Sequence, residues 1–471
     1  MSVLSFRDPE NFAVDVDGAW YRVASRRSAR ALGKLQADPL KDELVRSRSL
    51  LDFWQLDQAQ AQGVVQRISA TSTRPIAQGS EVFGVETVPL ISYPWEWPNG
   101  MLAAAGELTL QIRSQLLGIG LDLKDASALN IQFRGSTPVL IDIGSIELWR
   151  PNPSWNASRQ FIEHFINPLA IGSSKSVNSA DAWRLSNYRG VTTDVARALM
   201  PGSLKRKPGL TLLQATTKPV KANKPSETKY ADQARENPKL ALKATQSLTK
   251  RLSKAVANLD AGIHETTWAN YGSRDHYQSE DLDKKYHLTR SFISTDPSRC
   301  ALVLDIGGND GLIGTRLAEE LGANVVVMDA DSGALAALVT RLGTSSQQVT
   351  PWVGDITNPS PAFGLLSKEF AGLTERLKPS AVLCQAVLHH IVITQGVPMQ
   401  LAIDALAAFK APVQIEFATP DDEKVKLLLS QIPNWSGDYS TQALIDALKS
   451  RYQNVQEHGT TSTPRIIITA T

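Results

Sequence analysis

The most informative part of the sequence, "ALVLDIGGNDGLIGTRLAEELG", occupies residues 301–322. It begins as a short apolar run of the kind that forms a buried strand, continues through a glycine-rich turn, and ends with apolar residues at helical spacing. A strand, a glycine turn and a helix in this order open a nucleotide-binding α/β unit. Glycine permits positive φ angles and lets a ligand approach the backbone. The stretch therefore predicts a ligand crevice at the end of its strand.

Strand and helix patterns continue to alternate after this stretch. The apolar runs that predict further strands are "ANVVVMDA" (323–330), "VTPWVGDI" (349–356), "SAVLCQAVL" (380–388) and "APVQIEF" (411–417). Helical patterns separate them, and a helix with two last strands follows. This alternation predicts a doubly wound, Rossmann-like α/β sheet of seven strands with right-handed crossovers. Such sheets bind ligands at the carboxyl ends of their strands.

The glycine turn differs from the dinucleotide-binding pattern G-x-G-x-x-G. It has the form D-x-G-x-N-x-G, a variant of the methyltransferase motif D-x-G-x-G-x-G. Asparagine replaces one glycine of the motif, and it is the non-glycine residue that best tolerates a left-handed conformation. The predicted cofactor-binding residues of the turn are Asp305, Gly307, Gly308, Asn309 and Gly311.

Two carboxylates follow at the ends of the next two predicted strands. Asp329 ends the second strand, where an acid accepts the ribose hydroxyls of a nucleoside. Asp355 ends the third, where a carboxylate can accept from an adenine amino group. Ala330 and Ile356, which follow these acids, are predicted to line the same site. The ordered set resembles class I S-adenosylmethionine-dependent methyltransferases, with another nucleotide-binding α/β domain as the alternative.

This resemblance implies S-adenosyl-L-methionine as the cofactor and places Gln385 near its methyl-bearing sulfonium. His389 and His390 follow in a Leu-His-His sequence that many class I methyltransferases carry. An imidazole near neutrality can remove a proton from the hydroxyl or amine that attacks the methyl group. Glu416, at the end of the fifth strand, is a candidate base or a ligand for a substrate amine. A structural role is the alternative for either histidine, and no metal-binding cluster is predicted.

A second constellation lies in "LKDASALNIQFRGSTPVLIDIGS" (123–145). Asp125, Asn130 and Asp142 have the layout of a protein-kinase catalytic loop followed by a D-F-G motif. In that chemistry the first Asp orients a hydroxyl, and the Asn and the last Asp hold magnesium. Leu123 replaces the kinase histidine, and no V-A-I-K lysine or kinase glycine loop precedes it. A kinase-like lobe with a substrate or second site is one interpretation, and a hairpin of turn-forming residues is the other.

Aromatic residues mark two further segments. Tyr93 and Trp95, in "YPWEW" (93–97), predict either a wedge at a domain interface or a substrate contact. Trp268, Tyr271 and Tyr277 precede the first strand of the α/β fold, and they are predicted either to close over the cofactor or to pack structurally.

The chain as a whole resembles a bacterial group of two-part class I methyltransferases that includes the rhizobial nodulation proteins of the NoeA type. The N-terminal matches include "SFRDPENFAVDVDGAWYR", "SYPWEWPNGML" and "RQFIEHFINPLA". The C-terminal matches include "TTWANYGSRDHY", "MDADSGAL", "AVLHHIVITQGVPM" and "IEFATPDDEKVKLLL". The resemblance implies methyltransferase activity and leaves the methyl acceptor undefined.

Length and charge suggest the domain plan. The 471 residues exceed one ordinary core, and we expect an α+β domain over 1–200, a basic connector and helix over 201–260, and the methyltransferase domain over 261–471. Residues 205–254 contain 13 Lys and Arg but only three acids. This excess predicts either a nucleic-acid or other anion contact, or a solvated linker with a surface helix.

We therefore expect a two-domain methyltransferase that acts on an O or N nucleophile of a small-molecule or macromolecular acceptor. The alternative is a non-catalytic protein that senses S-adenosylmethionine or binds nucleic acid through the basic connector. With two cysteines, Cys300 and Cys384, no apolar run that could span a membrane and no secretory signal, we expect a cytoplasmic protein without a membrane partner.

Overall fold

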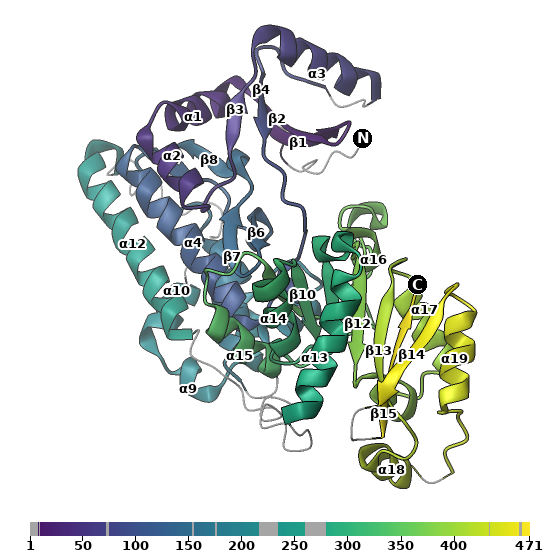
Figure 1. Cartoon of the computed structure of the whole chain (residues 1–471). Coiled ribbons are helices and arrows are strands. Elements are labelled where there is room, and N and C mark those ends of the chain that lie inside the picture. The colour runs from purple at the N-terminus through teal and green to yellow at the C-terminus, as the bar shows by residue number, and fades with distance from the viewer. Residues whose placement is uncertain are drawn as a thin grey trace. The chain divides into compact units, whose positions relative to one another are not determined.

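The structure is a computed structural model that describes residues 8, 10–71, 75–152, 155–174, 177–215, 234–259, 279–432, 434–460 and 464–471 (Figure 1). The chain divides into two compact units. Unit 1 comprises residues 1–133 and 137–262, and unit 2 comprises residues 134–136 and 263–471.

Unit 2 is built on a seven-stranded sheet with the order β11-β10-β9-β12-β13-β15-β14. Its strands are β9 (Val303–Ile306), β10 (Val325–Asp329), β11 (Val349–Val353), β12 (Ala381–Gln385), β13 (Val413–Ala418), β14 (Val455–Thr460) and β15 (Arg465–Ala470). The strands from β11 to β13 pair in parallel, whereas β15 is antiparallel to both β13 and β14. The predicted Rossmann-like, doubly wound sheet of seven strands is thus confirmed by strand order and direction.

The strand order reverses between β9 and β12. From β9 the chain winds outward through β10 and β11, and from β12 it winds the other way. Ligands of open α/β sheets bind at such a switch point, beyond the carboxyl ends of the strands. The helices of this unit are α13 (Ser279–Ser294), α14 (Leu312–Leu321), α15 (Ser332–Leu342), α16 (Leu373–Arg376), α17 (Met399–Ala407), α18 (Glu423–Ser430) and α19 (Thr441–Lys449).

Helix α14 packs closely on the sheet because Gly314 lacks a side chain. A Cβ atom at Gly314 would lie 2.9 Å from a methyl group of Val327 and 3.0 Å from one of Val325. The helix begins after Gly311 and ends before Gly322, and both glycines have left-handed backbone conformations. Gly314 therefore serves the helix-packing role that dinucleotide-binding motifs assign to their third glycine.

Unit 1 contains an antiparallel sheet with the order β1-β2-β4-β3 and two short strand pairs, β5 with β8 and β6 with β7. Its strands are β1 (Asn11–Val16), β2 (Ala19–Ala24), β3 (Phe53–Gln55), β4 (Glu81–Val85), β5 (Leu121–Leu123), β6 (Ile131–Arg134), β7 (Thr137–Leu140) and β8 (Ile146–Leu148). Its helices are α1 (Arg26–Gln36), α2 (Pro39–Arg46), α3 (Gln58–Thr71), α4 (Asn99–Gly118), α5 (Ser158–Phe161), α6 (Asn167–Gly172), α7 (Ser179–Leu185), α8 (Thr193–Leu199), α9 (Gly202–Lys205), α10 (Pro208–Ala215) and α12 (Pro238–Leu259). The predicted α+β character is confirmed.

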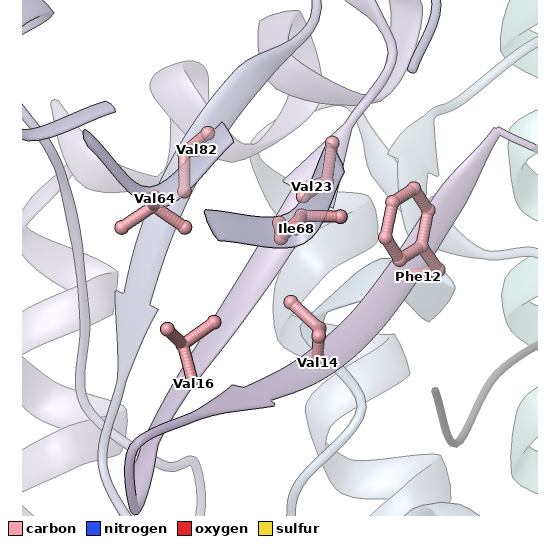
Figure 2. Close-up of a cluster of buried hydrophobic side chains, with 7 residues drawn as sticks. All are labelled: Phe12, Val14, Val16, Val23, Val64, Ile68 and Val82. Carbon is pink, nitrogen blue, oxygen red and sulfur yellow. The ribbon is translucent and has the colours of Figure 1, made fainter. Parts of the chain in front are cut away.

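One face of the antiparallel sheet packs against α3. Figure 2 shows the apolar cluster between them, to which β1 contributes every second residue because strand side chains alternate between faces. The opposite face of the sheet therefore carries the intervening residues, including Asn11 of β1 and Arg22 of β2. The cluster consists of Phe12, Val14, Val16, Val23, Val64, Ile68 and Val82.

Helix α12 packs along the long helix α4 within unit 1 (Figure 1). The guanidinium of Arg113, on α4, donates to both carboxylate oxygens of Asp122 at 2.7 and 3.1 Å and to Oγ1 of Thr249 at 2.7 Å. Burial lowers the pKa of Arg113, and the Asp122 carboxylate opposes this effect. These contacts attach the described second half of the basic segment to unit 1, while residues 216–233 lie outside the described part of the chain.

No helix within the described ranges is both long and apolar enough to cross a membrane.

Candidate active site

The glycine turn between β9 and α14 has the conformation that its sequence predicts. The φ angles are +67° at Gly307, +51° at Asn309 and +70° at Gly311, so all three residues are left-handed. A Cβ atom at Gly308 would lie 2.7 Å from Val327 Cγ1 and 2.8 Å from Asp305 Oδ2. A side chain does not fit there, and the turn therefore leaves backbone available to a ligand.

Asp329, at the end of β10, is tied to this turn. Its Oδ2 atom accepts the backbone N–H of Asn309 at 2.9 Å, and its Oδ1 atom accepts the N–H of Asp331 at 2.8 Å. Burial raises the pKa of Asp329 to about 6, against the effect of these hydrogen bonds. A carboxylate has about four acceptor positions, so both oxygens can accept further hydrogen bonds from ribose hydroxyls. Ala330 beside it is exposed.

Asp355 lies just beyond β11, the next strand outward. Its Oδ1 atom accepts the backbone N–H of Thr357 at 2.8 Å and the Thr357 hydroxyl at 2.7 Å. The residue between them, Ile356, is buried. The turn, Asp329 and Asp355 thus follow the carboxyl ends of three adjacent strands, β9, β10 and β11.

Asp305 lies within β9, one residue before the end of the strand, and is buried. Burial raises its pKa to about 7, and the charges of Asp329 and Asp310 raise it further. The ammonium of Lys285, on α13, acts in the opposite direction. Sequence analysis did not single out Lys285, which lies on the helix before the first strand of the sheet.

Lys285 also pairs with Glu416, which lies within β13 opposite Gln385 of β12. The Lys285 Nζ atom lies 2.6 Å from Glu416 Oε2, and Arg465 Nη1 lies 3.7 Å from Glu416 Oε1. Arg465 in turn holds Asp422, with 2.9 Å between Nε and Oδ2. Glu416 is therefore held between two cations at the carboxyl edge of the sheet.

Gln385, at the end of β12, is buried against α13 and β13. Its Nε2 atom donates to Thr289 Oγ1 at 2.8 Å and to Gln414 Oε1 at 3.2 Å. The next residue, Ala386, has φ of +57°. A non-glycine residue in this region is strained, and such strain is concentrated at functional sites. In the sequence, the spacing of four between Lys285 and Thr289 could have indicated that both side chains lie on one face of a helix and contact the sheet together.

The two histidines follow directly after this strained turn. Their ring centroids lie 4.1 Å apart, and a short π-helix, η8 (His390–Thr394), begins at the second of them. Burial lowers the pKa of His389 to about 3, with His390 and Arg465 acting in the same direction. Burial, with Lys424 and Arg465, also lowers the pKa of His390. Both imidazoles are therefore neutral near pH 7, and the low pKa makes His389 a weak base.

In unit 1, the structure brings the three residues of the second constellation together. The backbone N–H of Lys124 donates to the carbonyl of Ser145 at 2.8 Å, and the N–H of Ile141 donates to the carbonyl of Asn130 at 2.8 Å. These bonds hold the loop of Asp125 and Asn130 beside Asp142. Burial and the charge of Asp142 raise the pKa of Asp125.

Asp142 pairs with Arg22 on β2, whose Nη2 atom lies 2.5 Å from Asp142 Oδ1. The sequence offered no V-A-I-K lysine, and the cation that meets this carboxylate is an arginine from another strand. Tyr93 and Trp95 lie in the core of unit 1, with ring centroids 4.6 Å apart. Trp95 also packs against Tyr188 at 4.9 Å.

Trp268, Tyr271 and Tyr277 lie outside the described residues, so their predicted role stays a prediction. Among the residues that are described, no three His, Cys, Asp or Glu side chains form a group that could hold a metal ion.

Comparison with known proteins confirms the resemblance stated above. The chain is 27% identical over 461 residues to nodulation protein NoeA of Rhizobium meliloti (strain 1021), covering 96% of this chain and 92% of that protein. No model of a known protein family matches the chain.

Two methyltransferases are among the solved structures that are similar to the chain. One is magnesium protoporphyrin IX methyltransferase from Synechocystis PCC 6803 with bound SAH, with a TM-score of 0.29, 16% identity, and coverage of 40% of this chain and 83% of that one. The other is the bifunctional kinase-methyltransferase WbdD, with a TM-score of 0.29, 19% identity, and coverage of 43% and 41%.

Proposed function

We propose that the chain is an S-adenosyl-L-methionine-dependent methyltransferase that acts on an oxygen or nitrogen nucleophile of its acceptor. The observation that carries this proposal is the Asn309–Asp329 hydrogen bond at the switch point of the sheet. It joins a glycine turn without room for a side chain to a carboxylate with free acceptor positions, on adjacent strands. This pairing suits a nucleoside with its ribose hydroxyls toward Asp329.

The described residues fit the cofactor at three points. The backbone of the Gly307–Gly311 turn can approach the amino-acid portion, Asp329 can accept from the ribose, and Asp355 can accept from the adenine amino group. Ile356 supplies apolar surface beside Asp355. When bound, the cofactor supplies an electrophilic methyl group on a sulfonium.

Proton removal from the acceptor is assigned to the histidine pair. The neutral imidazole of His390 can accept a proton from a hydroxyl or an amine, as general bases do, whereas the low pKa of His389 suits a supporting role beside it. His390 is the more exposed of the two and is the better candidate for contact with the acceptor. Glu416, held by Lys285 and Arg465, suits the positioning of charge at the strand ends better than proton transfer.

The acceptor is a small molecule or a macromolecule that presents such a nucleophile. We place the reaction in a reducing compartment such as the cytoplasm, since Cys300 and Cys384 are both free thiols.

Isothermal titration of the full chain with S-adenosylmethionine tests the cofactor site. Asp329→Ala is expected to weaken binding at least tenfold, whereas Asp446→Ala, on the exposed side of α19, leaves it unchanged. Transfer of a tritiated methyl group to sugar, peptide and RNA extracts then tests catalysis. Binding without transfer to any extract would favour a sensor, and equal binding by the two variants would contradict the proposed site.

A further inference from the structure

We propose that unit 1 carries a second ligand site, in which Asp125, Asn130, Asp142 and Arg22 bind a magnesium-complexed polyphosphate, such as that of a nucleoside triphosphate. The site is formed within unit 1 and does not depend on the methyl transfer proposed for unit 2.

The acidic groups converge because the backbone holds two segments side by side. The hydrogen bonds Lys124 N–H to Ser145 O and Ile141 N–H to Asn130 O are both 2.8 Å long. One bond lies next to Asp125 and the other next to Asp142. These two backbone hydrogen bonds therefore hold the Asp125 and Asp142 carboxylates and the Asn130 amide close to one another.

Two polar side chains from other elements, the half-buried Gln160 and the buried His164, hold the Asp125 loop in place. The Ala126 N–H donates to Gln160 Oε1 at 2.8 Å. The Ala128 N–H donates to His164 Nδ1 at 3.2 Å, and the Ser127 hydroxyl lies 3.1 Å from the same nitrogen. A loop held by two side chains of other elements is preorganised, as the residues that contact a ligand must be.

Asn11 is a separate observation that points to a ligand. Its side chain is 0% exposed, yet neither amide atom has a hydrogen-bond partner among the described residues. A Cβ atom at Gly144 would lie 2.7 Å from Asn11 Nδ2 and 2.9 Å from Arg22 Nη1. Asn11 and Arg22 thus lie together against the turn that begins with Asp142. A buried amide without partners is rare in proteins and calls for an explanation.

Charge and ligand number indicate the chemistry. The two carboxylates repel each other, as the effect of Asp142 on Asp125 shows, and Arg22 balances only one of them. A divalent cation would balance the negative charge of the other carboxylate. Because no group of three acidic, His or Cys side chains that could hold a metal occurs in the described ranges, the protein alone does not complete a metal cage. Magnesium is usually held by one or two carboxylates plus phosphate oxygens, which the polyphosphate would supply.

Arg22 would serve the phosphate part of the ligand. Its guanidinium is nearly buried, and its Nε atom has no hydrogen-bond partner among the described residues. A guanidinium presents its donors in a fork that matches phosphate oxygens. Arg22 therefore can contact phosphate while it still holds Asp142.

The test is calorimetric titration of the full chain with Mg-ATP and, separately, with magnesium tripolyphosphate. We expect one site per chain that disappears when EDTA removes the metal. Asp142→Asn should weaken binding at least tenfold. Asp17→Asn, which makes the same change in an exposed turn of unit 1, should leave it unchanged.

Asp125→Asn keeps the test decisive if the Asp142 variant does not fold. Removal of this charge relieves repulsion, so the melting temperature of the free protein should stay the same or rise while ligand affinity falls at least tenfold. A purely structural Asp125 would not separate these two readouts. S-adenosylmethionine binding should be unchanged in both variants, so the outcome is independent of the proposed function.

Equal affinity for ATP and tripolyphosphate would support a site that recognises phosphates alone, and tighter binding of ATP would support one that also contacts the nucleoside. Absence of binding of both probes at millimolar concentration would overturn the proposal. Binding that survives EDTA, or that survives both substitutions, would overturn it as well.

Discussion

The Nζ atom of Lys285 lies 2.6 Å from Oε2 of Glu416, and both side chains are buried in unit 2. The pair joins α13 to β13 at the level of Gln385, the last residue of β12. It shows that the helix before the first strand contributes charge to the edge of the sheet where we place the cofactor.

Removal of one partner of this pair should be strongly destabilising. Glu416→Ala leaves the Lys285 ammonium buried without its nearest carboxylate, which costs about 3–5 kcal/mol of unfolding free energy. The double variant Lys285→Met/Glu416→Leu should cost clearly less than the sum of the single variants Lys285→Met and Glu416→Leu. Urea unfolding measures the free energy of unfolding of all four variants.

The exposed pair of Arg451 and Asp404, 2.6 Å apart, provides the control. Asp404→Ala should cost no more than about 1 kcal/mol, because surface ion pairs contribute little. Additive effects at Lys285 and Glu416 would show that the two side chains are not energetically coupled.

Gly308→Ala should damage both stability and cofactor binding. The new methyl group would lie 2.7 Å from Val327 Cγ1 and 2.8 Å from Asp305 Oδ2, so the turn must shift. We expect a loss of about 1–3 kcal/mol in unfolding free energy, the usual cost of overpacking, and at least tenfold weaker binding of S-adenosylmethionine.

Gly459→Ala is the matched control, since no atom lies within 4 Å of a Cβ atom at that position. Its cofactor affinity should equal that of the wild type. Equal affinity of the Gly308 variant would mean that the turn does not contact the cofactor.

Cofactor binding should weaken as pH falls below about 6. The pKa of Asp329 is raised to about 6 by burial, so its carboxyl group becomes protonated below that pH and loses acceptor capacity for ribose hydroxyls. The expected slope is about tenfold in affinity per pH unit below the pKa. Asp329→Asn should bind weakly, without this slope. Calorimetry from pH 5 to pH 8 measures both, and a slope retained in the variant would assign the titration to another group.

The same raised pKa has the opposite effect on the stability of the free protein. Between the ordinary pKa of 3.8 and about 6, the folded state holds the Asp329 proton more tightly than the unfolded chain does. The contribution of this group to stability is therefore present at low pH and is lost as pH rises through this interval.

His164 should make unit 1 sensitive to acid. Burial lowers its pKa to about 4, while its Nδ1 atom accepts the Ala128 N–H. Between pH 6.5 and 4 the unfolded chain binds the proton and the folded state does not, so stability is lost as pH falls. The full difference is about 3 kcal/mol, at 1.36 kcal/mol per unit of pKa.

Urea unfolding at pH 7, 6 and 5 measures this loss. His164→Gln should remove most of the slope between these pH values, although it lowers stability at pH 7. His287→Gln, an exposed position, should keep the slope of the wild type. An unchanged slope in the His164 variant would contradict the assignment.

Local patterns were sufficient to predict the glycine turn and its two acids. Strand, turn and helix are contiguous at residues 301–322, and the left-handed conformation of Asn309 follows from residue type and spacing. The positions of Asp329 and Asp355 could be predicted because each ends an apolar run, and the carboxyl ends of parallel strands meet at one edge of the sheet.

The partners of the candidate residues were not predictable in this way. Lys285 and Arg465 meet Glu416 from a helix before the sheet and from its penultimate strand in sheet order, and Arg22 meets Asp142 across a large part of the chain. Sequence spacing carries no information about such contacts, because they depend on how elements pack.

The alternation of strands and helices, the glycine turn and the positions of the two acids could thus be predicted from the sequence, since hydrophobic periodicity and backbone conformation are local properties. The charge state and accessibility of the polar groups depend on the tertiary structure. It buries Gln385 against Thr289, neutralises the histidine pair, holds Glu416 between two cations, and places the unpartnered Asn11 beside Arg22 at the Asp142 turn. Burial and charge neighbours arise from packing between distant segments, and these quantities set the chemistry that each side chain can perform.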